Sequence, residues 1–123
     1  GAIAPAPDVR NYTNLMLMLG EFESLTDFQR KKWGEENNWK HWVKGTCIIS
    51  EVSETSWASQ ISEAAYEVDC ELPNGDRAVL FYNKGGEETV AGFHKGEVLD
   101  FQGRLKSIQD WGFWRSGYIL IDG

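Results

Sequence analysis

Hydrophobic residues follow a helical spacing in the first third of the chain and an alternating spacing in most of the rest. Over residues 11–40 the apolar residues recur at intervals typical of a helix, and Gly20 is expected to interrupt them. Thr26 and Gln29 have the spacing of a capping box. In this motif the Thr26 hydroxyl accepts a hydrogen bond from the Gln29 backbone amide, while the Gln29 side chain accepts one from the Thr26 backbone amide. The aromatic residues expected to face inward from this helical segment are Phe28 and Trp33.

Five later segments are predicted to be strands because they alternate or are rich in β-branched residues. They are WVKGTCIISEVSE (42–54), ISEAAYEVDCEL (61–72), RAVLFYN (77–83), VLDFQGRLKSI (98–108) and YILIDG (118–123). Gly45 is expected to mark a bend or bulge in the first of them. The connection between the third and fourth strands has room for one helical turn around Val90 and Phe93.

The sequence PNGD at 73–76 is a strong hairpin signal, with Asn74 and Gly75 at its centre. A two-residue turn there places Cys70 opposite Val79 and Val68 opposite Phe81 on a core face. The other face is then expected to be acidic, and it holds Glu67, Asp69, Glu71, Leu80 and Tyr82.

Five short strands in this order favour a small closed barrel, because closure removes exposed strand edges. The long first strand, the glycine positions and the variable segment before residue 98 are typical of an OB-fold. We therefore expect an all-β, five-stranded OB-type Greek-key barrel, preceded by an N-terminal helical extension over 11–40.

Two stretches, LTDFQRKKW…WVKGTCIISEV and KGEVLDFQGRLKSI…YILIDG, resemble the tRNA-anticodon-binding-like OB-fold family of bacteria. The resemblance covers about residues 25–122 and lies in a diffuse pattern rather than in a catalytic signature. It implies an OB-fold, and it implies a function like that of the nucleic-acid-binding lipoproteins in that family.

The chain has 123 residues, which suits one domain over 11–123 after an Ala/Pro-rich spacer at 1–10. Such a spacer often follows a cleaved signal or a lipid anchor, so it favours an exported, periplasmic or lipid-anchored protein over a cytoplasmic one. The formal net charge is −7, which counts against broad binding to nucleic acid because Lys and Arg supply most non-specific affinity for phosphates.

Cys47 and Cys70 are expected roughly opposite each other on the first two predicted strands. Two interpretations stay open: a disulfide, which would indicate an oxidising compartment, or two buried thiols that act as small apolar residues. The two cysteines and the two scattered histidines, His41 and His94, lack the spacing of zinc ligands, and no cofactor is expected.

Aromatic residues are dense in SIQDWGFWRSG, residues 107–117, which connects the last two predicted strands. In OB-folds this loop, the loop after the first strand and the face of the second and third strands bind the ligand. Phe113 is expected in the core, whereas Trp57 and Trp111 are expected to be exposed. The predicted ligand-binding residues are Trp57, Tyr82, Trp111, Trp114, Arg115, Arg104 and Lys106.

Aromatic rings beside an arginine suit stacking on the bases of a single strand, so single-stranded nucleic acid is the first predicted ligand. The acidic face predicted for 67–71 opposes that interpretation, because carboxylates repel phosphates. An acidic face of this kind is typical of a solvated outer surface, or of a surface that binds a protein, peptide or small ligand at the cell envelope. No phosphate loop, nucleophile elbow or zinc-protease pair is present, so a non-catalytic binding module is predicted.

Overall fold

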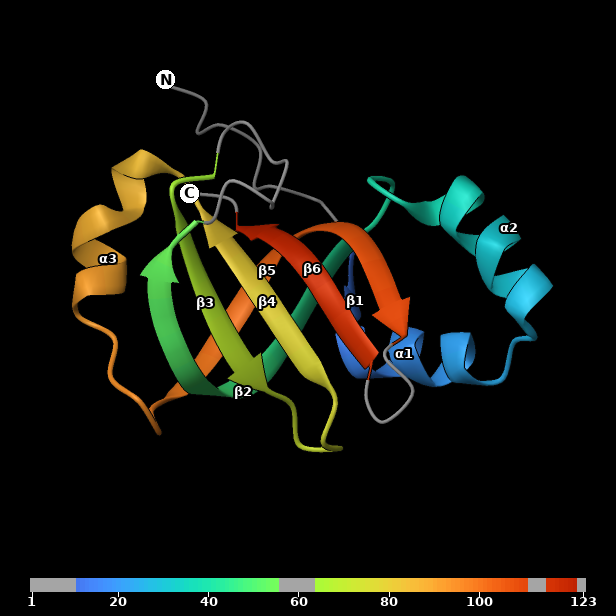
Figure 1. Ribbon diagram of the computed structural model, residues 1–123, viewed down its shortest axis with the longest axis horizontal. Coiled ribbons are helices and arrows are strands. Elements are labelled where there is room, and N and C mark those ends of the chain that lie inside the picture. Colours follow the sequence, from blue (N-terminus) through green and yellow to red (C-terminus); the bar gives the residue numbers. More distant parts are fainter. Residues whose placement is uncertain (1–10, 56–63, 111–114, 122–123) are drawn as a thin grey trace, which may run out of the picture.

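The computed structural model describes residues 11–55, 64–110 and 115–121. The chain is mostly β, with short helices at either end of the strands (Figure 1). The elements are β1 (Tyr12–Asn14), α1 (Leu15–Glu23), α2 (Asp27–Asn37), β2 (Trp42–Glu54), β3 (Tyr66–Glu71), β4 (Arg77–Tyr82), the 3-10 turn η2 (Lys84–Gly86), α3 (Glu87–Ala91), β5 (Val98–Asp110) and β6 (Arg115–Ile121). The spacer predicted at 1–10 lies outside the described residues.

The strands form one sheet in the order β1-β2-β3-β4-β6-β5, and β2 also pairs with β5. Five strands therefore close into a ring, β2-β3-β4-β6-β5, in which every strand has a neighbour on both sides. The β4–β6 pairing is parallel and the other pairings of the ring are antiparallel. All five predicted strands are present, and β1 is a sixth that pairs in parallel with one end of β2.

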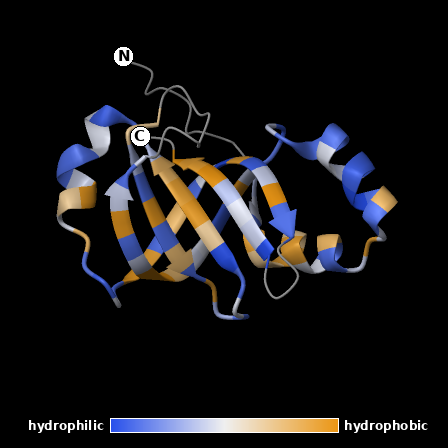
Figure 2. Cartoon of the chain, viewed as in Figure 1, coloured by the Kyte–Doolittle hydropathy of each residue, from blue (hydrophilic) through white to orange (hydrophobic). Residues whose placement is uncertain are grey.

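The interior of the ring is filled by alternate residues of each strand, as a pleated sheet with one buried face requires. Hydrophobic segments concentrate on the strands and on α1, whereas α2 is mostly hydrophilic (Figure 2). The buried strand residues of this core are Val43, Cys47, Ile49, Val68, Cys70, Ala78, Leu80, Tyr82, Phe101, Leu105, Ile108 and Ile119.

The N-terminal segment differs from the helical extension over 11–40 that the sequence predicted. Residues Tyr12–Asn14 form β1, and Asn14 then caps α1 by accepting a hydrogen bond from the Met16 amide at 2.9 Å. The prediction that Gly20 interrupts the helix is wrong: α1 runs through it to Glu23. The buried face of α1, led by Leu15 and Leu19, packs against the strands, and this packing outweighs the poor helix propensity of one glycine.

The predicted capping box at the start of α2 is confirmed, with Gln29 N donating to Thr26 Oγ1 and Thr26 N donating to Gln29 Oε1. Trp33 is buried as predicted and packs edge-to-face on Phe22, with ring centroids 5.6 Å apart. The inward orientation predicted for Phe28 is wrong, because its side chain is 68% exposed. Five residues separate it from Trp33, so it lies about 140° around the helix from the buried face.

The hairpin between β3 and β4 has a longer loop than the two-residue turn that the sequence predicted. Leu72 N donates to Asp76 O at 2.7 Å, and Gly75 adopts a left-handed backbone with φ of 89°. Three residues therefore connect the strands, a loop type that uses glycine at its left-handed position. Every cross-strand pair shifts by one, so that Cys70 faces Ala78 and not Val79.

This shift exchanges the two faces of β4. Leu80 and Tyr82, predicted on the acidic outer face, are buried in the core beside β3. Phe81, predicted in the core, lies on the outer face opposite Glu67. The placement of the β3 residues was right, since Val68 and Cys70 are buried. The loop length, which a turn motif alone does not determine, accounts for the error.

At Gly45, where a bend or bulge was predicted, the pairing of β2 with β5 shows no bulge, and the register of β2 shifts instead between Ile49 and Glu51. Gly45 has another role. A Cβ atom at this position would lie 2.7 Å from the ring of Phe101, the residue opposite it on β5. The glycine therefore makes room for an aromatic ring over the strand.

Candidate ligand-binding face

The outer face of β3, β4 and β6 corresponds to the face predicted to bind a ligand. The strand registers define two rows across it, Glu67–Phe81–Leu120 and Asp69–Val79–Tyr118. Each row therefore begins with a carboxylate on β3 and continues over apolar or aromatic side chains. We call these six residues the acidic–aromatic face.

Two aromatic rings stack on this face. The ring centroids of Phe81 and Tyr118 are 6.2 Å apart and their planes are inclined by 18°. Phe81 is only 2% exposed, whereas Tyr118 is half-buried. Phe81 thus supports its neighbour, and Tyr118 is the more accessible ring of the pair.

The carboxylates of the acidic–aromatic face are partly removed from water. Burial raises the pKa of Glu67, and the nearby charge of Asp69 adds to this effect. Burial also raises the pKa of Asp69; Arg77 opposes the increase and Glu51 adds to it. A face that holds desolvated acids repels phosphates and favours neutral or cationic groups.

The 107–117 stretch, predicted as a loop, is strand over much of its length. β5 continues to Asp110 and β6 begins at Arg115, so the connection is confined to 111–114. The end of β5 is fixed by an ion pair between Arg30 of α2 and Asp110. Arg30 also donates to two carbonyls, of Phe22 at 3.2 Å and Glu23 at 3.0 Å.

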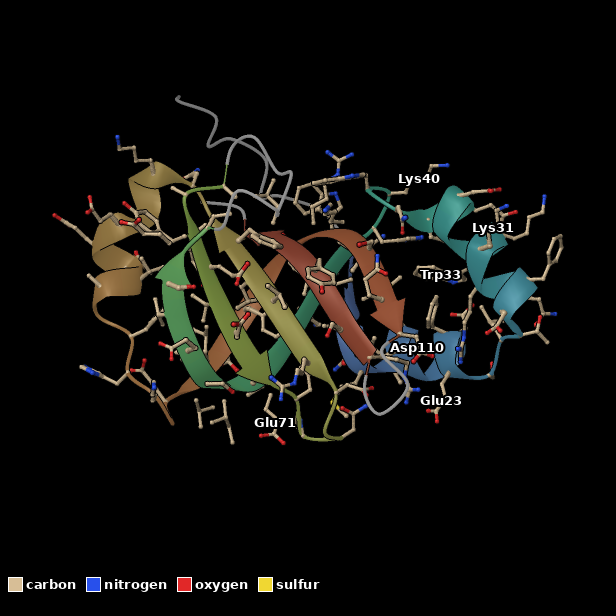
Figure 3. The ribbon with its side chains drawn as sticks, viewed as in Figure 1. Glu23, Lys31, Trp33, Lys40, Glu71 and Asp110 are labelled. Carbon is tan, nitrogen blue, oxygen red and sulfur yellow. The ribbon has the colours of Figure 1, made fainter. Side chains whose placement is uncertain are left out.

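The start of β6 is fixed by the residues around Arg115. Its backbone amide donates to Asp76 Oδ1 at 3.2 Å, and its Nη2 lies 3.1 Å from Glu23 Oε2. Its Nε is 3.6 Å from the other carboxylate oxygen of Asp76, in the β3–β4 turn. Figure 3 shows Glu23 and Asp110 together at this end of the molecule. Both ends of the 111–114 connection are therefore held by charged side chains.

The residues Glu23, Arg30, Asp76, Asp110 and Arg115 form a cluster, which we call the charged clamp. Sequence reasoning did not find this set, because its residues come from three separate stretches of the chain, 23–30, 76 and 110–115, and share no motif. The two arginines of the clamp pair with its three carboxylates, so the clamp serves to hold elements together. Among residues 11–55, 64–110 and 115–121, no group of three or more acidic, His or Cys residues is placed to hold a metal ion.

The structure does not bring the predicted cationic residues together. Arg104 donates from Nε to Trp39 O at 2.7 Å and lies over the Trp39 ring, 5.5 Å from its centroid. It pairs with Leu120, five positions along β6 from Arg115, which corresponds to about 16 Å. Lys106 is half-buried at the register shift in β5. Arg104 and Arg115 therefore do not lie together, and the ligand-binding role of Arg104, Lys106 and Arg115 stays a prediction.

The predicted aromatic ligand contacts divide into two groups. Tyr82 is buried in the core, where its ring meets Phe93 edge-to-face at 5.9 Å, and burial raises its pKa to about 12. Its predicted place on the binding face is therefore wrong. Trp57, Trp111 and Trp114 lie outside the described residues, and their roles stay predictions.

The two cysteines are neighbours but do not face each other directly. Cys70 is opposite Ile49, and Cys47 lies two positions further along the same buried face of β2, a diagonal arrangement. Both are buried free thiols in this structure. Contact with Cys47 and burial raise the pKa of the Cys70 thiol. The disulfide stays a prediction.

Comparisons with known proteins relate this fold to solved structures. No protein-family model matches the chain, and no curated protein matches it. A crystal structure of a "putative nucleic acid-binding lipoprotein" from Klebsiella pneumoniae is similar, with a TM-score of 0.59 and 16% sequence identity over 94% of this chain and 95% of that one. In the part of the chain described here, no helix is long and apolar enough to cross a membrane. The chain shares its fold with that lipoprotein.

Proposed function

We propose that this protein is a non-catalytic binding module with an OB-fold. The strand order carries the proposal. The long β2, which is the first strand of the ring, pairs with β3 and β5, and β4 pairs in parallel with β6. The short helix α3 lies between the third and fourth ring strands, as an OB-fold allows. The similarity to a lipoprotein named for nucleic-acid binding supports the proposal at the level of fold.

The ligand we propose first is a single-stranded oligonucleotide that stacks on aromatic residues. In this proposal the rings are Trp57, Trp111 and Trp114, assisted by Tyr118 on the acidic–aromatic face. The charged clamp supports the proposal because it fixes both ends of the 111–114 connection, which lowers the entropic cost of presenting its side chains. Arg115 has an ion-pair role there, so stacking rather than phosphate contact would supply most of the affinity.

A second candidate is a cationic peptide or protein segment at the cell envelope. The observation that favours it is the pair of partly desolvated acids, Glu67 and Asp69, beside the apolar Val79. A lysine or arginine side chain would neutralise these carboxylates, whereas a phosphate would be repelled. The envelope location is part of the proposal, and the spacer at 1–10 and the lipoprotein neighbour support it.

The experiment is a titration of tryptophan fluorescence with a single-stranded oligonucleotide at low and at high salt. We expect quenching at low salt, and Trp111→Ala is expected to weaken binding by about 1–3 kcal/mol. A duplex of the same sequence serves as the control, because its bases are already stacked. Absence of any change at low salt would remove nucleic acid as the ligand.

The same titration with a short oligolysine peptide tests the second candidate. Binding of the peptide that is lost in the double variant Glu67→Gln/Asp69→Asn, while the oligonucleotide produces no change, would assign the acidic–aromatic face to a cationic partner. If neither probe binds, the proposal of a binding function at this face is wrong.

A further inference from the structure

A second surface of the molecule, formed by β2 and β5, carries a gradient of polarity along the strands. Alternate residues of β2 point outward, and the register places each of them opposite an outward residue of β5. The three successive pairs are Lys44–Gln102, Thr46–Asp100 and Ile48–Val98. The surface is therefore cationic and polar at one end and apolar at the other.

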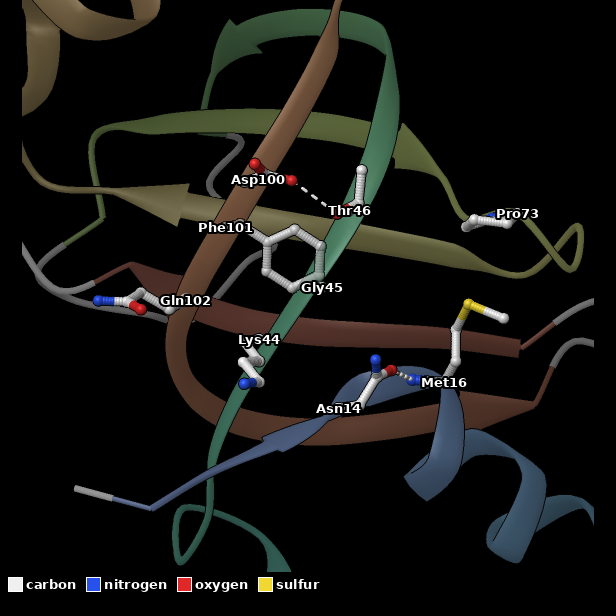
Figure 4. A pocket seen from close by; sticks show the side chains of 9 residues that line it. All are labelled: Asn14, Met16, Lys44, Gly45, Thr46, Pro73, Asp100, Phe101 and Gln102. Atoms are coloured by element: carbon white, nitrogen blue, oxygen red, sulfur yellow. Dashed lines mark hydrogen bonds between the residues drawn. The ribbon is translucent and has the colours of Figure 1, made fainter.

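A cavity of about 430 Å³ lies beside the polar end of this gradient. It occupies a gap at the edge of β2, because β1 pairs with β2 only as far as Lys44 and β3 pairs with it only from Ile48 onward. Figure 4 shows Asn14 and Met16 on one side of the gap and Pro73 on the other. The volume is within the range of small-molecule sites.

A second cavity, of about 230 Å³, adjoins the apolar end. It shares Thr46 and Pro73 with the first, so the two cavities adjoin each other, and together we call them the groove. Its walls include Ile48 and Val98, which are 49% and 66% exposed and belong to the few large hydrophobic residues that the described surface leaves in water. Adjacent exposed aliphatic side chains favour an apolar ligand group at this end.

The charges along the groove determine how a ligand would be oriented. None of the ion pairs between described residues includes Lys44, and its neighbour across the β1–β2 pair is Asn14. Asp100 in the middle accepts a hydrogen bond from Thr46 at 2.6 Å, and Glu71 lies at the apolar end. An anionic group is therefore attracted only at the Lys44 end.

We propose that this groove binds a small anionic amphiphile, such as a medium-chain fatty acid. Its carboxylate would pair with Lys44, and its alkyl chain would extend past Thr46 to Ile48 and Val98. Four residues of strand separate Lys44 from Ile48, a span of about 13 Å that suits a medium-length chain. The groove shares no residue with the acidic–aromatic face, so the proposal is independent of the proposed function.

The test is an NMR titration of the ¹⁵N-labelled protein with sodium decanoate below its critical micelle concentration. We expect shift changes along β2 and β5, centred on Gly45, Thr46 and Val98. Lys44→Gln is expected to weaken binding about fivefold, as loss of an exposed ion pair does. Val98→Thr, which keeps the side-chain shape, is expected to weaken it about threefold to tenfold through lost apolar contact.

The controls separate this groove from general hydrophobic binding. Lys31→Gln removes a positive charge from exposed α2 and is expected to leave the affinity unchanged (Figure 3). Acetate tests the head group alone, and decyltrimethylammonium tests a tail with the opposite charge; both are expected to bind more weakly than decanoate. Equal binding by either, or an unchanged affinity in Lys44→Gln, would overturn the proposal. Shift changes seen only with phosphatidylglycerol vesicles would also overturn it and assign the surface to membrane contact.

Discussion

Arg30 and Asp110 form an ion pair across 80 positions of the sequence, and it joins the second helix to the last residue of β5. Both side chains are about one-fifth exposed, so the pair is shielded from much of the solvent. The guanidinium also lies over the ring of Phe22, 5.1 Å from its centroid. One arginine thus ties the helical segment to the strand that leads into the aromatic connection.

Replacing Arg30 by Ala is expected to lower the free energy of unfolding by about 1–3 kcal/mol, because charged hydrogen bonds and an aromatic contact are lost together. Urea denaturation followed by circular dichroism measures the change. Lys31→Ala, on the exposed side of the same helix, is the matched control and should fall within about 0.5 kcal/mol of the wild type. Equal effects of the two substitutions would show that the ion pair contributes nothing.

Replacement by Ala should change the stability of the protein in opposite directions at two of its glycines. At Gly103 a Cβ atom would lie 2.4 Å from the carbonyl oxygen of Leu120, so Gly103→Ala must push β5 and β6 apart and should cost about 3 kcal/mol. At Gly20 nothing lies within 4 Å, and Gly20→Ala should stabilise α1 by about 0.5–1 kcal/mol. Thermal unfolding of both variants measures this, and a stable Gly103→Ala variant would contradict the strand register.

The thiols of Cys47 and Cys70 are expected to be unreactive in the folded protein. Both are buried, and the pKa of Cys70 is raised, so little thiolate forms. Iodoacetamide should modify them only after denaturation, as mass spectrometry will show. If they form the predicted disulfide instead, alkylation of the denatured protein requires a reductant, and the unreduced mass is lower by two hydrogen atoms.

The acidic–aromatic face should make stability fall as the pH rises from acidic values. The pKa values of Glu67 and Asp69 are raised in the folded protein, so between the unfolded and folded pKa values the folded state binds more protons. This contribution to stability is present at pH values below the pKa values of the unfolded chain. It is lost as the pH rises through the pKa values of the folded protein.

The double variant Glu67→Gln/Asp69→Asn should therefore be more stable than the wild type at neutral pH, with a smaller decline on raising the pH. Urea midpoints across a pH series measure this. Glu71→Gln, exposed at the end of the same strand, is the control and should leave the decline in place. A double variant with the pH profile of the wild type would contradict the burial of these carboxylates.

Periodicity located the strands well because alternation directly reflects which face of a sheet is buried. β2 has the predicted bounds of 42–54, and the burial of Val68 and Cys70 was also predicted. The error in β4 came from the hairpin, since PNGD is compatible with loops of two or three residues. The loop length is set by how the flanking strands twist and pack, which the four letters do not encode.

The candidate site was less predictable because its parts come together only in three dimensions. Arg115 was predicted to contact ligand, yet its charge is matched by Glu23 from α1 and Asp76 from a turn. Arg104 likewise meets Trp39, whose left-handed backbone with φ of 66° has no sequence signal. Predicting such pairs requires the topology first, and local spacing does not supply it.

The position of β1 has a mechanical consequence. Only three residues of β1 pair with β2, in parallel, and the strand is not a member of the ring. Tension applied to the chain ahead of Tyr12 would load those few hydrogen bonds first. They can break while the ring stays closed, so β1 would release extra chain length without unfolding the ring.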